Sequence, residues 1–174
     1  DHYLSIDPAR PDWPERDRFV LSKGQASGIL YCVLADLGFF PLDELDHFCQ
    51  VDGKFGVHLQ HDVPGVEITS GSLGHGIGVA TGLALAAKLN RELHLTVTLL
   101  GDGECYEGSV WEAAMFASHN RLNNLVAIVD RNHQCATDFT ENGLQLEPLG
   151  DKWASFGWNV VHVDGHSCAE LMRV

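Results

Sequence analysis

The residues best suited to chemistry are an aspartate between two glycines, Gly101-Asp102-Gly103, and an asparagine about thirty residues later, Asn132. A carboxylate oxygen and an amide oxygen are ligands that Mg²⁺ readily accepts, commonly together with phosphate oxygens. The two glycines permit a tight turn and let backbone N–H groups approach an anion closely. The pattern therefore predicts a site for magnesium and a diphosphate, although GDG by itself also occurs as a simple turn.

Two apolar runs, 95–100 and 125–129, must position these residues, because each run ends at one of the polar tips. Their weak alternation is typical of strands covered on both faces in a parallel sheet with a crossover helix. We expect that helix to begin near Glu107 to Val110, where its positive end would favour an anion. Ligands of open α/β sheets lie at the carboxyl ends of the strands, so both tips should face one crevice.

The rest of the chain predicts further elements of an α/β fold around this unit. A short strand or strap is expected at 17–21 and another strand at 158–163, while 50–68 and 134–146 are predicted loops. Helices are predicted at 22–37, with Ser22 as N-cap, and at 42–48, 79–89, 147–156 and from Ser167 onward. The glycines at 71, 74, 76 and 78 fit neither the dinucleotide fingerprint nor the G-x-S-x-G elbow of hydrolases.

The composition limits the binding partners and the cellular compartment that we expect for the protein. With 174 residues and 45% hydrophobic content, we expect one domain over 1–174, and the start at Asp1 suggests a domain incomplete at both ends. The net charge of -13 argues against nucleic acid and anionic membranes as partners. Five cysteines without CxxC spacing predict no disulfide framework, and no signal peptide or spanning apolar run is found. We therefore expect a cytoplasmic protein.

The GDG motif followed by NNLVAIVDRN resembles the thiamine diphosphate signature of the transketolase family. DRFVLSKG, PGVEITSGSLGHGIGVATGLALA and LEPLGDKWASFGWNVVHVDGH are similar to further segments of the family, in the family order. The likeness covers nearly the whole chain and is strongest to the N-terminal, diphosphate-binding part of two-subunit transketolases. It implies the thiamine diphosphate-binding fold, a three-layer α/β/α arrangement with a mostly parallel sheet.

The resemblance also assigns roles to individual residues. It implies that Asp102, Asn132 and the Gln134 carbonyl hold Mg²⁺, for which Ca²⁺ could substitute. The residues expected to contact thiamine diphosphate are Gln25, Gly71, Ser72, Leu73, Gly101, Gly103 and Asn132. His58 would contact the donor sugar and Glu107 would join a carboxylate network across a subunit interface. From the residues alone, His58 is more often an exposed loop histidine, and Glu107 could equally be a helix-start glutamate. A zinc site from His58 and His61 is possible but lacks further ligands.

One position departs from the family pattern. Transketolases usually have LSKGHA where this chain has LSKGQA, so Gln25 replaces a histidine near the diphosphate and the substrate. Glutamine can donate a hydrogen bond but cannot carry charge or shuttle a proton. The usual donor and acceptor sugars are therefore not assured for this chain.

The resemblance implies a transferase of carbohydrate metabolism that moves a two-carbon ketol unit from a ketose phosphate to an aldose phosphate, with the cofactor carrying the electron-sink chemistry. The glutamate that activates the cofactor belongs to a pyrimidine-binding domain of the family. We expect a C-terminal partner subunit to supply it, in a dimer of heterodimers. Two alternatives remain open: acetyl transfer from an α-keto acid, and a catalytically silent cofactor-binding subunit.

Overall fold

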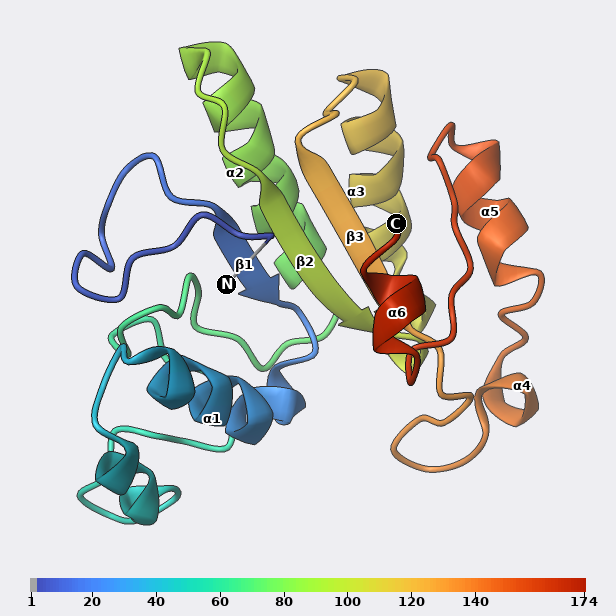
Figure 1. Ribbon diagram of the computed structural model, residues 1–174. Coiled ribbons are helices and arrows are strands. Elements are labelled where there is room, and N and C mark those ends of the chain that lie inside the picture. Colours follow the sequence, from blue (N-terminus) through green and yellow to red (C-terminus); the bar gives the residue numbers. More distant parts are fainter. Residues whose placement is uncertain (1–2) are drawn as a thin grey trace.

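A parallel sheet of three strands forms the centre of the computed structural model, which describes residues 3–174 (Figure 1). The strands are β1 (Arg18–Leu21), β2 (Thr96–Gly101) and β3 (Leu125–Asp130), in the order β1-β2-β3. Both pairs are parallel, with Thr96 of β2 opposite Arg18 of β1 and Leu125 of β3. The strands predicted at 95–100 and 125–129, and the short strand at 17–21, are confirmed.

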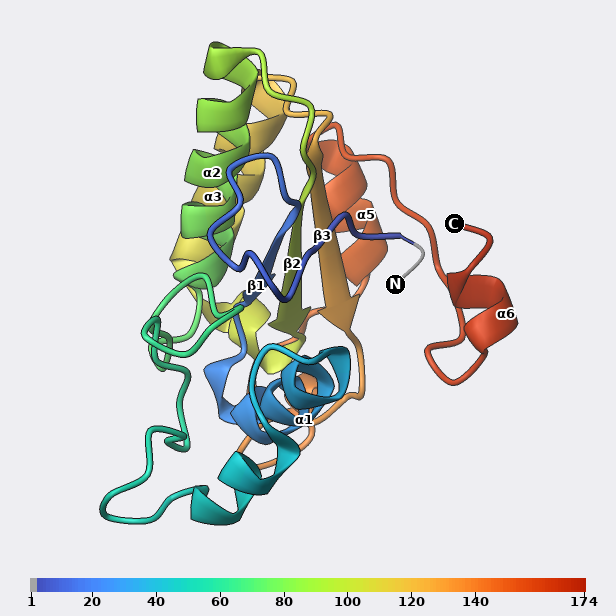
Figure 2. The same cartoon turned by 60° about the vertical axis from the view of Figure 1, so that its left-hand side comes forward.

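Two helices cover one face of the sheet, α2 (Gly76–Asn90) and α3 (Gly108–His119) (Figure 2). Helix α3 joins β2 to β3 and begins where the sequence predicted. Helix α2 begins three residues earlier than the predicted 79–89. Its buried alanines, Ala80 and Ala84, form a core cluster with Val20 of β1, because small side chains let the helix approach the sheet closely.

The opposite face of β1 packs against α1 (Ser27–Leu37). Leu21 belongs to the buried cluster that includes Tyr31 and Leu34 of α1. The helix layers on the two faces agree with the predicted α/β class. Over β3 the second face is more open, with Val126 and Ile128 at 43% and 44% exposed.

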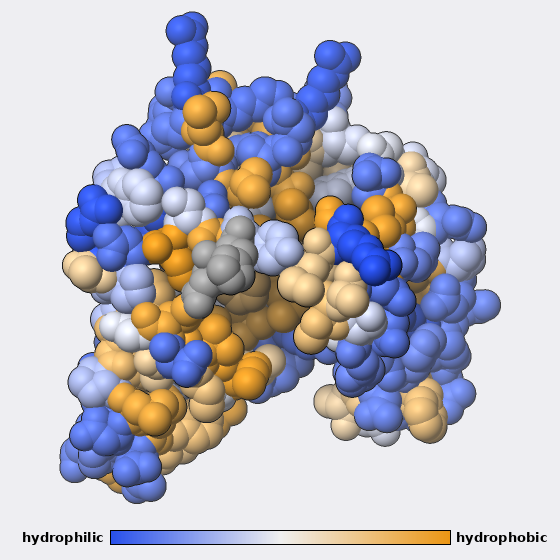
Figure 3. Space-filling model, in the orientation of Figure 1, coloured by the Kyte–Doolittle hydropathy of each residue, from blue (hydrophilic) through white to orange (hydrophobic). Residues whose placement is uncertain are grey.

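A cavity of about 310 Å³ lies between β1, α1 and the N-terminal segment. Apolar side chains such as Leu4, Phe19 and Leu30 line it. Figure 3 shows apolar residues gathered on this face, where Ile29 and Val33 of α1 are exposed. None of the residues predicted for the cofactor site lines this cavity.

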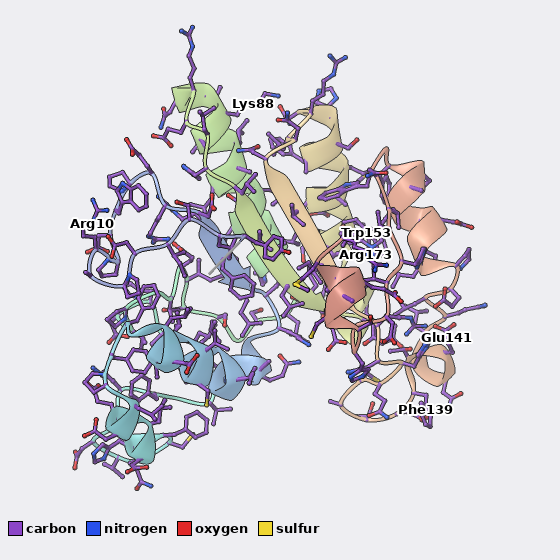
Figure 4. All side chains as sticks on the ribbon, viewed as in Figure 1. Arg10, Lys88, Phe139, Glu141, Trp153 and Arg173 are labelled. Atoms are coloured by element: carbon purple, nitrogen blue, oxygen red, sulfur yellow. The ribbon has the colours of Figure 1, made fainter. Side chains whose placement is uncertain are left out.

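The predicted strand at 158–163 is wrong, because this segment is not a strand in the structure. Its aromatic residue packs against helices instead. Trp158 meets Trp153 edge-on at 5.1 Å between ring centroids, and its indole N–H donates to the Ala114 carbonyl of α3 at 3.0 Å. Figure 4 shows Trp153 on the helix beside α3. An apolar run becomes a strand only where a neighbouring strand accepts its backbone hydrogen bonds.

The remaining helical elements are short. They are η1 (Gly24–Ala26), η2 (Leu42–His47), η3 (Gly103–Tyr106), α4 (Thr140–Gly143), α5 (Leu149–Ser155) and α6 (Cys168–Leu171). The helices predicted near 42–48, 147–156 and after Ser167 are thus present, while the predicted loop 134–146 contains α4. Ser22 is not the predicted N-cap, because η1 precedes α1 and the Ser22 hydroxyl bonds elsewhere. No helix within residues 3–174 has the length and apolarity needed to cross a bilayer.

Candidate functional site

The polar tips of β2 and β3 lie side by side, as predicted. Gly101 pairs with Asp130 in the sheet register, and the Asp102 N–H donates to the Asp130 carbonyl at 3.2 Å. The chain after β3 then turns back, so that the His133 N–H donates to Asp102 Oδ2 at 2.7 Å. Residues from both strand ends therefore contact the same carboxylate.

Asp102 is buried, with 1% of its surface exposed, and three donors reach its carboxylate. Oδ1 accepts from the Gly103 N–H at 2.7 Å. Oδ2 accepts from the His133 N–H and from Arg131 Nη1, at 2.7 and 2.8 Å. A buried carboxylate is stable only when such donors replace water. Because two of these donors are the backbone N–H groups of Gly103 and His133, Asp102 also holds the backbone of both tips.

Arg131 connects the strand ends to the following loop and was not recognised from the sequence. Besides Asp102, it binds Glu141 at 2.8 Å and Glu147 at 2.9 Å. Partial burial lowers the pKa of Arg131, but the bonds to Asp102 and Glu147 outweigh it and raise that pKa. The Leu149 N–H and Arg131 lower the pKa of Glu147. Figure 4 shows Glu141 at the short helix α4, beyond β3.

The oxygens of this turn are suited to a divalent cation. Three donors use three of the roughly four lone-pair sites of the Asp102 carboxylate, which leaves one on Oδ1. Asn132 Oδ1 accepts one hydrogen bond, from the Gln134 N–H at 2.9 Å, and has a second lone pair. The turn's own hydrogen bonds use the carbonyls of His133 and Asp138 and leave the Gln134 carbonyl available. Hard oxygen ligands of this kind match Mg²⁺.

Gly103 lies close to the loop that follows β3. A Cβ at this position would be 2.9 Å from the Cβ of Cys135 and 3.8 Å from the Gln134 carbonyl oxygen. Only glycine fits without a shift of the facing loop. Gly103 is therefore packed closely against the loop that carries Gln134, whose carbonyl was predicted to hold the metal.

Two cysteines near this turn differ in acidity. Burial, followed by the nearby Glu104 and Asp102 charges, raises the pKa of Cys105 to about 12. Backbone hydrogen bonds from the Thr137 and Asp138 region lower the pKa of Cys135. Since the thiolate is the reactive form, we expect Cys135 to react faster than Cys105.

The glycine-rich segment meets the loop that carries His58. Gly71 has φ of +153°, and a Cβ there would lie 3.1 Å from His58 Cδ2, so the imidazole covers the Gly71 backbone. Side chains rarely adopt this φ, which explains the glycine. His61 does not join His58: its Nδ1 and its N–H bond the Thr69 hydroxyl at 3.0 and 3.1 Å. Among the described residues no group of three or more His, Cys, Asp or Glu could hold a metal.

Gln25 lies next to the same segment. Gly24 is buried, and a Cβ at Gly24 would collide with the Ser70 hydroxyl and come within 3.1 Å of the Gly71 nitrogen. Gln25 itself is exposed, as are Ser72 and Gly71, while Leu73 is half-buried. The structure thus brings the 24–25, 58 and 71–73 segments together beside the strand ends.

Glu107 precedes α3 and is exposed. Its side chain borders the glycine-rich segment, since a Cβ at Gly74 would lie 2.5 Å from Glu107 Cβ. The neighbouring Ser109 hydroxyl donates to the Gly74 carbonyl at 3.0 Å. Glu107 is the N-cap residue of α3 and makes no side-chain capping hydrogen bond, so its interpretation as an exposed helix-start glutamate and its predicted place in a carboxylate network both stay open.

Glu104 is a second buried carboxylate that sequence analysis missed. It is 2% exposed and accepts hydrogen bonds from Ser22, Gly74 and Gly101. The sequence signal was weak, because a glutamate in the first turn after GDG is also favoured by the helix dipole.

Comparisons with known proteins agree on one family. Residues 1–173 match the family described as transketolase, thiamine diphosphate binding domain. The chain is 43% identical over 170 residues to a 6-deoxy-6-sulfo-D-fructose transketolase subunit from Clostridium sp. (strain MSTE9), covering 97% of this chain and 62% of that protein. It is 40% identical over 170 residues to one of the subunits of an apulose-4-phosphate transketolase from Phocaeicola vulgatus, covering 98% and 60%.

A solved structure agrees with these matches. The crystal structure of transketolase from Campylobacter jejuni superposes with a TM-score of 0.93 at 31% sequence identity, covering 99% of this chain and 28% of that one. The chain thus spans about three fifths of the two-subunit relatives and about a quarter of the single-chain enzyme. On the matches along its whole length, the chain belongs to the transketolase family and corresponds to its thiamine diphosphate-binding domain.

Proposed function

We propose that this chain is the diphosphate-binding part of a transketolase that uses thiamine diphosphate and Mg²⁺ and acts with a partner subunit. The observation that carries the proposal is the convergence of both strand ends on Asp102, whose carboxylate accepts from the Gly103 and His133 N–H groups. This convergence occurs at the carboxyl edge of a parallel sheet, where α/β proteins bind ligands.

Asp102, Asn132 and the Gln134 carbonyl would hold the magnesium ion, and Ca²⁺ could replace it at these oxygens. The backbone of Gly101 and Gly103 would lie against the diphosphate. When bound, thiamine diphosphate supplies the electron sink that transfer of a two-carbon ketol unit needs. The protein's part is to orient the cofactor and the sugars.

His58, Gln25 and the 71–73 segment would face the cofactor rings and the donor sugar. The exposed imidazole of His58, which lies beside the Gly71 backbone, would orient a hydroxyl group of the donor. Gln25 would hydrogen-bond at the same edge without transferring a proton. Glu107, beside Gly74, would serve the carboxylate network at the subunit interface.

We infer a donor with an acidic group, because both two-subunit relatives are named for such compounds, 6-deoxy-6-sulfo-D-fructose and apulose 4-phosphate. Aldose phosphates are the proposed acceptors. The partner would be a C-terminal transketolase subunit with the pyrimidine site and the activating glutamate, in a dimer of heterodimers. The five cysteines are free thiols, which fits a reducing compartment such as the cytoplasm.

The decisive experiment is to express the full-length subunit, isolate the protein that co-purifies with it, and assay the pair. Ketose donors with phosphate or sulfonate groups would be offered with an aldose phosphate acceptor, with and without thiamine diphosphate and Mg²⁺. We expect transfer that requires both the partner and the cofactor.

Other outcomes would support other functions. A pair that binds the cofactor but never releases the shortened aldose from any ketose would support a silent binding subunit, as the loss of histidine at position 25 allows. Carbon dioxide release from pyruvate would support acetyl transfer. No cofactor binding by the pair would overturn the proposal.

A further inference from the structure

Glu104 connects three segments that border the candidate site. Its Oε1 accepts from the Ser22 hydroxyl at 2.5 Å and from the Gly74 N–H at 2.8 Å. Its Oε2 accepts from the Gly101 N–H at 3.0 Å. The first two donors are 82 and 30 residues away in sequence, so Glu104 joins segments that the chain itself does not hold together.

Each donor belongs to a different part of the site. Ser22 follows β1 and leads to the 24–25 loop. Gly74 comes directly after 71–73, the segment expected against the cofactor rings. Gly101 ends β2 and begins the turn expected against the diphosphate. A single buried side chain therefore contacts all three.

The chemistry of these contacts suits a carboxylate. A carboxylate accepts without donating, so its two oxygens can satisfy three donors at once. Glu104 is only 2% exposed, so water cannot readily replace it as a partner for the two backbone N–H groups. A Cβ at Gly76 would lie 2.5 Å from the Cα of Ser22, which places the two segments in direct backbone contact. A substitution at Glu104 would consequently change the positions of both the segment after β1, at Ser22, and the segment at 74–76.

We propose that Glu104 is a positioning residue that sets the distance between the 71–73 segment and the 101–103 turn. It would thereby fix the separation of the ring end and the diphosphate end of the thiamine diphosphate site. The inference rests on the proposed function, but the hydrogen bonds that carry it do not involve the cofactor or the metal.

Hydrogen exchange of the full-length subunit with its partner, without cofactor, tests the contacts directly. In Glu104→Gln the side chain keeps its size, but its NH₂ group must face one of the donors. We expect peptides spanning 70–77 and 99–104 to exchange at least about tenfold faster than in the wild type. Glu112→Gln, a change at an exposed glutamate of α3, should leave both peptides unchanged.

Cofactor titration of the same proteins tests the consequence. We expect thiamine diphosphate to bind Glu104→Gln about 10–100-fold more weakly, as for other residues that orient the ligands of a site. At saturating cofactor, kcat should stay within about twofold of the wild type, because Glu104 does not contact the substrate. Ser22→Ala removes one of the three bonds and should give a smaller loss of affinity.

These measurements separate the possible roles of Glu104. A purely structural role would lower Tm in Glu104→Gln and leave the affinity of the folded protein unchanged, which would overturn the proposal. Unchanged exchange in both peptides would also overturn it. If Glu104→Gln does not fold, Ser22→Ala must show faster exchange and weaker binding, or the proposal fails. If the wild-type pair binds no thiamine diphosphate, the proposed function fails, while the exchange data still judge the contacts of Glu104.

Discussion

The strand-end side and the loop side of the candidate site are built differently. On the strand-end side, Asp102 and Glu104 are 1% and 2% exposed, and each accepts three hydrogen bonds. On the loop side, Gln25, His58 and Ser72 are exposed, and the His58 imidazole lies beside Gly71.

The difference separates two tasks. The buried carboxylates satisfy backbone N–H groups and hold the loops in place, so replacing them should affect both stability and cofactor binding. The exposed side chains are free to meet ligands, so replacing them should affect substrate use with little loss of stability. Each prediction below tests this division.

The largest effect is expected from Asp102→Ala. Cofactor affinity in the presence of Mg²⁺ should fall by about 100-fold or more, since a predicted metal ligand is lost as well as its hold on both tips. The unfolding free energy should fall by about 1–3 kcal/mol, because the Gly103 and His133 N–H groups lose their partner. Calorimetric titration with the partner present, and denaturant unfolding, measure the two. Asp151→Ala, at an exposed position of α5, is the control, and unchanged affinity in Asp102→Ala would refute the metal assignment.

Gly103→Ala should have the next largest effect. The added Cβ would lie 2.9 Å from that of Cys135, so the facing loop must shift, at a cost of about 1–3 kcal/mol. Cofactor affinity should fall with it, because the loop that must shift carries the Gln134 carbonyl predicted to hold the metal. Cys135→Gly removes the opposing Cβ, and a double-mutant cycle should therefore show recovery of stability. Additive losses in the double variant would contradict this close approach.

His58→Ala should change substrate handling alone. The KM for the ketose donor should rise by about tenfold, the value of one lost hydrogen bond. The unfolding free energy should stay within about 0.5 kcal/mol of the wild type, because the side chain is exposed. Steady-state kinetics of the reconstituted pair and thermal unfolding check both. A loss of cofactor affinity as large as in Asp102→Ala would contradict the view that the strand-end side serves cofactor binding and the loop side serves substrate use.

The smallest perturbation is a chemical label that leaves the fold intact. At pH 8, iodoacetamide should modify Cys135 much faster than Cys105, whose pKa burial raises to about 12 and which therefore stays a thiol. The lowered pKa of Cys135 means that its labelling rate should reach its plateau at a lower pH than that of an ordinary thiol. Peptide mapping follows both cysteines, and Cys135→Ser assigns the signal. Thiamine diphosphate with Mg²⁺ should slow the labelling of Cys135; equal rates with and without them would place the cofactor elsewhere.

Much of the strand-end side was predictable from the sequence. Apolar runs that end in GDG and in DRN predicted β2 and β3, and the crossover helix between them required both ends to lie at one edge. Since consecutive parallel strands usually pair, the approach of Asp102 to the turn after β3 followed from local patterns alone. The segments that resemble the transketolase family extended this to the loop side, including His58 and 71–73. The glycine at position 71 fits the positive φ observed there.

The tertiary structure decided what depends on partners distant in the chain. Ser22 has the residue type of an N-cap, yet its hydroxyl bonds Glu104, 82 residues later. Residues 158–163 have the composition of a strand, yet Trp158 packs on Trp153 and α3. Arg131 looks like a loop cation, yet it bonds the buried Asp102. Local propensity indicates which structures a segment can adopt. A hydrogen bond or a strand forms only where folding places a partner beside it, and the whole chain determines that partner.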